Sequence, residues 1–326
     1  MRISGNQLTQ KYAGVRHSTR QSESEHALEL DFKPIGEEDM MLIREFTRFN
    51  VGRTCDYTIG GIFMWIDYFD YEYCISDDTL FIKGISESHP GMVAFSLPIG
   101  RLTLDESVTR IINYCHSHSL RPAFSAIPSD KAGKIAELTG GKVEALDGWS
   151  DYLYDANALA TLQGKAYSKK RNHVNRFLSD NPDYKFEMIT EANMSDALAF
   201  LETVVVEDKE DKEMAGYELE QCKNVLLNID TYLFDGAILR RQNGDVCALT
   251  LGEVIGDTLY VHVEKMDHEV AGAGEAINKM FAAEMKMRYA EISYINREED
   301  MNDSGLRFAK ESYHPVALLD KCNVII

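Results

Sequence analysis

LYVHVEKMDHEVAGAGEAINKMF, residues 259–281, is the stretch that decides the fold. Its first part alternates apolar and polar residues, which predicts a β-strand, and the part after Gly274 has the spacing of a helix. Exposed amides at a helix N-terminus suit a phosphate or a carboxylate, and Gly272 and Gly274 would let such a ligand approach the backbone. A turn that only starts a helix tightly against a sheet has the same spacing, so the glycines alone leave both interpretations open.

The segments around this stretch predict a mixed α/β domain. Three antiparallel strands are expected over residues 231–266, with turns at NGD and GD, and the last of them leads into the glycine turn. The remaining strands are expected at 184–190, 291–298 and 315–326, and the helices at 167–178, 194–208, 217–229, 274–290 and 304–313.

The first half of the chain has a similar order of elements. Strands are expected over 63–84, as strand, turn and strand, and over 92–100 and 121–130; helices are expected over 41–49, 104–120 and 131–140. We therefore predict a polar N-terminal tail over 1–30, a first domain over 31–157 in a supporting role, and a second domain over 158–326 that carries the site. The two domains would join near DYLYDANALATLQ, residues 151–163.

Composition limits the classes of function. The 326 residues hold 53 acidic and 34 basic side chains, a formal net charge of -19, which argues against DNA as a partner. The six cysteines lack the spacing of a disulfide framework, and CHSH at 115–118 does not put its ligands on one helix face, so no metal site is expected. The chain also lacks a long apolar run and the apolar core of a signal peptide, and it is expected to be cytoplasmic, with peripheral contact at the inner membrane face left open.

One short helix is basic although the protein is acidic. In YSKKRNHVNRF, residues 167–177, Tyr167, Val174 and Phe177 form an apolar side. A solvated helix face is the ordinary explanation of such a charge run, but it should also carry acids. We therefore predict that the run binds an anion or the acidic face of a partner. The basic residues of this run are Lys169, Lys170, Arg171, His173 and Arg176.

A second cluster lies near the C-terminus, in YINREEDMNDSGLRFAKESYHP, residues 294–315. Asn296, Arg297 and Glu298 end a predicted strand, where ligands of open α/β sheets bind. Arg307 and Lys310 are three residues apart on the following helix and so share a face, with Tyr313 close behind. A salt-bridge network that fixes the helix to the strand would use the same residues.

The segment VHVEK adds a possible proton-transfer group. In a strand, His262 and Glu264 point to one face and Lys265 to the other. A lone histidine in a strand is more often structural, but a neighbouring glutamate favours proton transfer.

Taken together, DYLYDANALATLQGKAYSKKRNHVNRF, VHVEK and INREEDMNDSGLRFAKESYHP resemble the family related to the C-terminal domain of phosphatidylglycerol lysyltransferase. GGIFMWIDYFDYEYCISDDTLFIKG and FSLPIG in the first half fit the same family. The resemblance implies two tandem GNAT-like domains, the fold of acyl-CoA N-acyltransferases. It also implies kinship with enzymes that move an amino acid from aminoacyl-tRNA to a lipid headgroup or another small amine acceptor.

On this hypothesis, the candidate site residues take different roles. Glu264, His262, His173, Glu298 and Arg307 are candidates for proton transfer or charge stabilisation, and Lys169, Lys170, Arg171, Arg176, Lys265, Asn296, Arg297, Lys310 and Tyr313 for binding substrate or anions. Two alternatives remain. An acyltransferase would hold acyl-CoA at Gly272 and Gly274, although Glu269 stands where that family places a cation; a non-catalytic module would bind an anionic ligand with the same residues.

Overall fold

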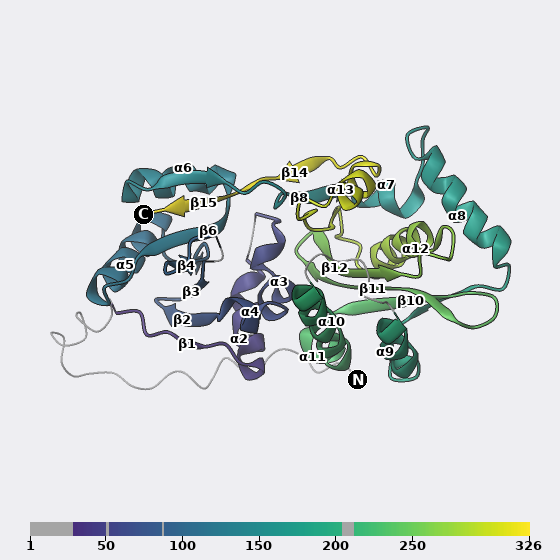
Figure 1. The fold of residues 1–326 in the computed structure, drawn as a ribbon, viewed down its shortest axis with the longest axis horizontal. Helices are drawn as coiled ribbons and strands as arrows, with labels where there is room; N and C mark the ends of the chain where they lie inside the picture. Colours follow the sequence, from purple (N-terminus) through teal and green to yellow (C-terminus); the bar gives the residue numbers. More distant parts are fainter. Residues whose placement is uncertain (1–28, 50–51, 87, 204–211) are drawn as a thin grey trace.

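The computed structural model describes residues 29–49, 52–86, 88–203 and 212–326. The predicted tail, 1–30, therefore lies almost wholly outside the described residues. The fold is two lobes side by side, each built on one mixed β-sheet (Figure 1). No helix in the described ranges is long and apolar enough to cross a bilayer.

The first lobe is an eight-stranded sheet with the order β1-β2-β3-β4-β6-β15-β7, in which β5 pairs with β3. Two helices, α5 (Leu104–Ser117) and α6 (Ser129–Thr139), pack on it around Phe81, Phe95 and Phe124, which are fully buried. The strands are β1 (Lys33–Pro34), β2 (Glu72–Ser76), β3 (Thr79–Ile85), β4 (Val93–Phe95), β5 (Ile99–Gly100), β6 (Pro122–Pro128), β7 (Lys142–Ala145) and β15 (Lys321–Ile325).

The second lobe is a seven-stranded sheet with the order β14-β8-β13-β12-β11-β10-β9. Its strands are β8 (Asp151–Asp155), β9 (Lys185–Met188), β10 (Asp235–Arg240), β11 (Val246–Ile255), β12 (Thr258–Met266), β13 (Tyr294–Asn296) and β14 (Ala317–Leu319). One face packs against α7 (Ala156–Thr161), α8 (Ser168–Asp180) and α12 (Ala273–Arg288), and the other against α9 (Met194–Thr203), α10 (Lys212–Leu227) and α11 (Ile229–Tyr232). Helix α13 (Ser304–Glu311) follows β13.

One hydrophobic cluster contains residues of both lobes. Short helices of the first half, α2 (Met40–Thr47), α3 (Ile59–Phe63) and α4 (Ile66–Phe69), lie between the lobes, together with 3₁₀ turns at Glu37–Asp39 and Cys55–Tyr57 (Figure 1). Ile43 and Ile62 from this layer belong to the same buried cluster as Leu249 and Val263 of the second sheet. Burial of apolar surface between the lobes therefore favours one fixed arrangement of the two.

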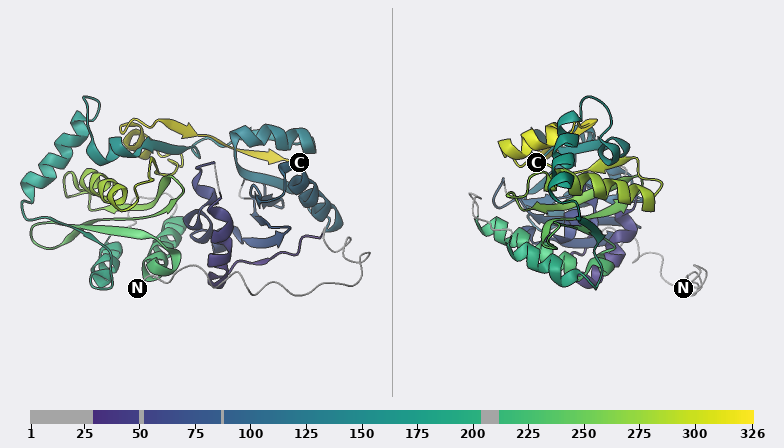
Figure 2. Two further views of the ribbon diagram at one scale, coloured as in Figure 1. Left: turned by 180° about the vertical axis from the view of Figure 1, so that it is seen from behind. Right: turned by 90° about the vertical axis from the view of Figure 1, so that its right-hand side faces the viewer.

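The predicted domain boundary, between residues 157 and 158, does not separate the two sheets, because two strands pair in the sheet of the other predicted domain. Strand β8, from the predicted first domain, is an interior strand of the second sheet, and β15, from the predicted second domain, lies between β6 and β7 of the first. Figure 2 shows from behind how the C-terminal strand reaches into the other lobe. The segment 151–163, expected to join the domains, forms β8 and α7.

Most predicted elements are confirmed, including the antiparallel strands β10, β11 and β12 and the basic helix α8. Three predictions are wrong. Residues 92–100 form the two strands β4 and β5 instead of one. Residues 63–69 are helical instead of extended, because Ile59, Ile62 and Ile66 are spaced as on a helix that packs between the lobes. Residues 315–326 form two strands instead of one, because β14 and β15 pair in different sheets.

Candidate active site

The candidate site lies where two parallel strands separate. Strands β12 and β13 pair over only three residues, from Thr258 with Tyr294 to Tyr260 with Asn296. Strand β12 then continues to Met266, whereas β13 ends at Asn296. Polar side chains from the rest of β12 and from the loop after β13 therefore meet beyond the last paired residues.

A partly buried ion pair occupies this opening. Arg297 Nη2 donates to Glu264 Oε1 at 2.8 Å, and Asn278 Nδ2 of α12 donates to Glu264 Oε2 at 3.2 Å. The Arg297 guanidinium also lies 4.8 Å from the ring centre of Tyr313. Burial alone would lower the pKa of Arg297, but the Glu264 carboxylate outweighs burial and raises it, so the guanidinium stays charged.

Three buried polar atoms around Glu264 have no hydrogen-bond partner within the described part of the chain. They are Arg297 Nη1, Asn278 Oδ1 and the Oγ1 of Thr250, the residue opposite Glu264 on β11. One is a donor, one is an acceptor, and the hydroxyl can be either. Buried polar groups without a partner are rare in folded proteins, so three such atoms around one carboxylate need an explanation.

Two lysines flank the ion pair. Lys170 Nζ of α8 lies 3.4 Å from Glu275 Oε1 and 4.0 Å from the ring centre of Tyr313. Lys310 of α13 is buried and donates to the backbone carbonyls of Arg297 and Glu299. Burial lowers the pKa of both lysines, because it disfavours the ammonium form.

His262 lies between two carboxylates. Its Nδ1 is 2.7 Å from Glu298 Oε1 and its Nε2 is 3.1 Å from Glu253 Oε1. Burial alone would lower the pKa of His262, but the two hydrogen bonds outweigh burial and raise it to about 10. The imidazole is therefore a cation at neutral pH, and Glu298, whose side chain is 27% exposed, is the partner that solvent reaches.

Other predicted site residues have structural partners. Arg307 makes two 2.8 Å hydrogen bonds to Asp300, and they hold the pKa of that carboxyl at about 2. Asn296 is fully buried and donates to Asp151, and Lys265 pairs with Glu218 of α10 on the other face of the sheet. The Arg307 pair joins α13 to the loop that follows β13.

Some basic side chains of α8 are exposed, and others contact residues of neighbouring elements. Lys169, His173 and Arg176 are exposed on α8, where Arg176 Nε lies 3.6 Å from Asp180 Oδ2, and the apolar side predicted for this helix is buried. Lys170 points to the Glu275 and Tyr313 side chains, as above. Arg171 instead donates to the carbonyls of Leu162 and Gly164, which fixes the end of α7.

The glycine turn is in contact with the chain itself. A Cβ at Gly272, where φ is 81°, would lie 2.2 Å from the carbonyl oxygen of His173 on α8. A Cβ at Gly274 would lie 2.4 Å from the sulfur of Met266. The close approach that both glycines permit is thus made by α8 and by β12, which is the tight-packing alternative of the two left open by the sequence.

Sequence reasoning missed a second buried polar cluster, at the joint between the sheets. Lys321 Nζ lies 2.7 Å from Asp56 Oδ2 and from Asp151 Oδ1, and 3.5 Å from Cys55 Sγ. Cys55, Asp56 and Asp151 are close enough together to hold a metal ion, but the Lys321 ammonium already supplies the positive charge there. A lone lysine in the apolar strand KCNVI was the available signal.

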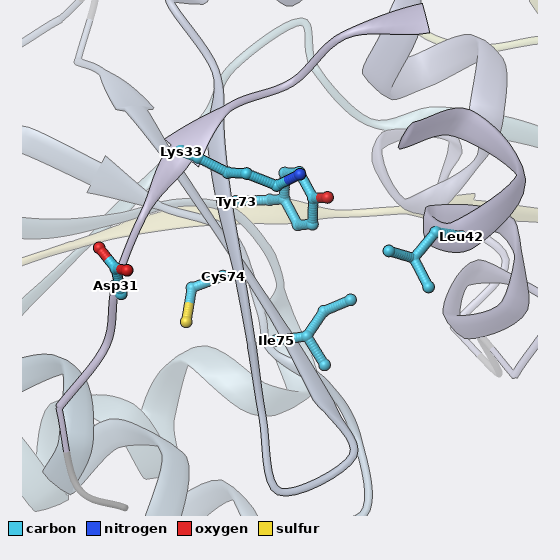
Figure 3. A pocket seen from close by; sticks show the side chains of 6 residues that line it. All are labelled: Asp31, Lys33, Leu42, Tyr73, Cys74 and Ile75. Atoms are coloured by element: carbon cyan, nitrogen blue, oxygen red, sulfur yellow. The ribbon is translucent and has the colours of Figure 1, made fainter. Parts of the chain in front are cut away.

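Two surface hollows are lined by residues other than Glu264, Arg297 and His262. One, of about 300 Å³, is on the first lobe and is lined by Asp31, Lys33, Leu42, Tyr73, Cys74 and Ile75 (Figure 3). The other, of about 350 Å³, lies at Arg53, Asp257 and Tyr260, between the lobes. Lys33 and Tyr73 in the first hollow both bond Asp39, an arrangement that stabilises β1 and needs no ligand.

Two lobes of this topology, with a polar opening between parallel strands and a helix that starts at a glycine turn, define a tandem GNAT-like fold. This confirms the predicted fold class. The chain belongs to the family described as "Phosphatidylglycerol lysyltransferase, C-terminal", whose model matches residues 48–322.

Similar proteins include solved structures and one curated relative. A conserved protein of unknown function from Bacteroides thetaiotaomicron is 30% identical, with a TM-score of 0.83, over 91% of this chain and 99% of that one. L-PGS from Bacillus licheniformis is 14% identical, with a TM-score of 0.62, over 90% and 92%. An uncharacterized protein of Mycoplasmoides gallisepticum is 20% identical over 176 residues, 53% of this chain and 54% of that protein, so the chain spans about half the length of the curated relative it matches.

Proposed function

We propose that this protein transfers an aminoacyl group from aminoacyl-tRNA to a lipid headgroup or another small acceptor. One observation carries the proposal: around Glu264, three buried atoms have no hydrogen-bond partner among the residues that the structure describes, namely Arg297 Nη1, Asn278 Oδ1 and Thr250 Oγ1. An aminoacyl ester offers a carbonyl oxygen, which accepts from Arg297, beside an α-ammonium, which donates to Asn278 and Thr250. The donor and acceptor groups of this cluster therefore match those of an amino acid ester.

The reaction needs placement and charge stabilisation more than a covalent intermediate, because the ester is already activated. A hydroxyl or amine of the acceptor attacks the ester carbonyl, a new bond forms to that carbon, and the bond to the tRNA ribose oxygen breaks. The developing oxyanion faces the Arg297 guanidinium, which stays charged. Glu298, the accessible carboxylate next to His262, accepts the acceptor's proton and then returns that proton to the departing ribose oxygen.

The donor's phosphates are assigned to the exposed cations of α8. Lys169, His173 and Arg176 are exposed on this helix, and Lys170 of the same helix reaches the ion-pair site. A phosphate chain bound along α8 would thus bring its aminoacyl end towards Tyr313 and Glu264. An anionic lipid headgroup as acceptor, with peripheral contact of the protein at a membrane, is the second part of the proposal.

The test is transfer of radiolabelled amino acid from a mixed pool of aminoacyl-tRNA to anionic lipid vesicles and to a panel of small amines. We expect label in one acceptor, lost in Arg297→Lys and Glu264→Gln. Arg240→Lys is the matched control, because Arg240 is equally buried and bonds two carboxylates, but at the far edge of the same sheet. Saturable tRNA binding without transfer would favour the non-catalytic module, and thermal protection by acyl-CoA alone would favour the acyltransferase.

A further inference from the structure

The carboxylate of Glu298 is connected to the first lobe through two side chains. Glu298 Oε1 contacts His262 Nδ1 at 2.7 Å, and His262 Nε2 contacts Glu253 Oε1 at 3.1 Å. Glu253 is fully buried, and its Oε1 also accepts from the backbone N–H of Gly60 at 2.7 Å. Its Oε2 lies 3.4 Å from Arg44 Nη1, so both oxygens of Glu253 are held by residues of the first lobe.

The imidazole between these carboxylates has no room to turn. The His262 side chain is 1% exposed. The centre of its ring lies 5.3 Å from the ring centre of Phe234 and 6.3 Å from that of Tyr260, and both pairs of rings are stacked. Gly60 packs against the third side, where a Cβ would lie 2.5 Å from His262 Nε2. The position of α3 in the first lobe therefore fixes the ring.

Glu298 is held in an unusual backbone conformation at the same place. Its φ is 57°, which a glutamate rarely adopts, and its N–H donates to Asn296 Oδ1 at 2.7 Å. Strained residues persist only where their surroundings fix them, and they are frequent at functional sites. Glu298 therefore combines an unusual backbone conformation, a hydrogen bond to the His262 imidazole and a partly exposed carboxylate.

We infer that Glu253 and His262 form a positioning pair through which the first lobe holds the Glu298 carboxylate at the opening between β12 and β13. This inference rests on the proposed function for the role of Glu298 as proton acceptor. It gives the first lobe, predicted to be a support, a defined part in the chemistry. Glu253 and Gly60 act through His262 and do not touch substrate.

The charged groups that face the pair come from four elements. They are Glu253 on β11, Glu298 after β13, Arg44 on α2 and Lys310 on α13, which acts on Glu298. Two carboxylates contact the imidazole directly, and neither cation does. The imidazolium is therefore stable well above neutral pH, and its titration reports whether both carboxylates are in place.

The first measurement is an NMR titration of histidine ring nitrogens in the full chain, with His262 assigned by comparison with His262→Asn. We expect His262 to stay protonated to about pH 10 and its midpoint to fall in Glu253→Gln. Asp39→Asn is the control: Asp39 is also a buried, hydrogen-bonded carboxylate, but it bonds Lys33 and Tyr73, away from His262. A wild-type midpoint near 6.5 would overturn the pair whatever reaction the protein performs.

The second measurement is transfer kinetics. Glu253→Gln and Gly60→Ala should lower kcat by roughly 10- to 100-fold while the KM for the donor is retained, and Glu253→Asp should recover part of the loss. Wild-type kcat in Glu253→Gln, with the histidine midpoint lowered, would overturn the positioning role. If the wild type transfers nothing, the proposed function fails. The carboxyl ¹³C chemical shift of Glu298 then tests whether Glu253 positions Glu298 through His262. A chemical shift that is unchanged in Glu253→Gln would overturn the inference.

Discussion

The Nζ of Lys321 lies 2.7 Å from Oδ1 of Asp151, and each residue belongs to a different sheet. Both side chains are buried, and Asp151 also accepts from the Cys55 backbone N–H at 2.7 Å and from Asn296 at 2.8 Å. Burial alone would lower the pKa of Lys321, but the carboxylates around it outweigh burial and raise it. This ion pair joins the C-terminal strand of the first lobe to an interior strand of the second.

Removal of the lysine should therefore destabilise the whole protein. Lys321→Met leaves Asp151 buried without its cation, and we expect the free energy of unfolding to fall by about 3–5 kcal/mol. Urea unfolding at pH 7 measures the change. Lys142→Met, which breaks an exposed pair with Glu144, should cost less than about 1 kcal/mol. Equal stabilities of Lys321→Met and wild type would show that the pair does not join the lobes.

Glu299 should make stability depend on pH. Burial raises its pKa from 4.5 to about 7, so the folded state binds this proton more tightly than the unfolded state. The resulting stabilisation is fully present below about pH 4.5 and is lost as the pH rises through about 7, by at most about 3 kcal/mol. From pH 5 to 8, the free energy of unfolding should fall less steeply in Glu299→Gln than in wild type. The same dependence on pH in both proteins would contradict the raised pKa.

Gly272 should tolerate alanine poorly because of α8. Gly272→Ala adds the strain of a φ of 81° and a Cβ that would lie 2.2 Å from the carbonyl of His173, so we expect a loss of about 2–4 kcal/mol. Gly244→Ala is matched in strain, with a φ of 93°, but its Cβ meets nothing within 4 Å, and it should lose only about 1 kcal/mol. Thermal or urea unfolding compares the two, and equal losses would mean that α8 moves aside freely.

The exposed cations of α8 should affect binding without affecting stability. Lys169→Ala with Arg176→Ala should change the free energy of unfolding by no more than about 0.5 kcal/mol. The same double variant should bind tRNA more weakly, and its dependence on salt should be shallower by a slope of about 1 for each phosphate that is no longer neutralised. Filter binding at several salt concentrations measures this. Arg171→Ala should instead lower stability, because Arg171 holds the end of α7.

The local elements were predictable because their causes are local. The strands β10, β11 and β12 were predicted from their apolar residues and from the turn sequences NGD and GD between them. The apolar side of α8 predicted Val174 and Phe177 as buried residues. Residues 63–69 were mistaken for a strand because aromatic residues favour strands wherever packing does not decide otherwise. Here packing between the lobes decides, and the segment is helical.

For the site, the sequence indicated that Glu264, Arg297 and Lys310 are polar groups near a strand end, but not which of them pair. Glu264 and Arg297 are 33 residues apart, and their contact depends on the strands β12 and β13 separating after Tyr260 and Asn296. Thr250 and Asn278 have nothing unusual in their sequence context. They matter only because burial leaves one polar atom of each without a partner among the described residues.

The sequence by itself determined the family, through the resemblance of its motifs to that family. It also determined the mixed α/β class, the order of most elements and the basic helix, because these three follow from local periodicity and local composition. Only the tertiary structure decided that β15 returns to the first sheet, that Lys321 neutralises Asp151, and that the first lobe holds His262 through Glu253 and Gly60. Lys321 and Asp151 are far apart in the chain, and so are Gly60 and Glu253. Desolvation at the joint makes each buried charge there depend on a partner.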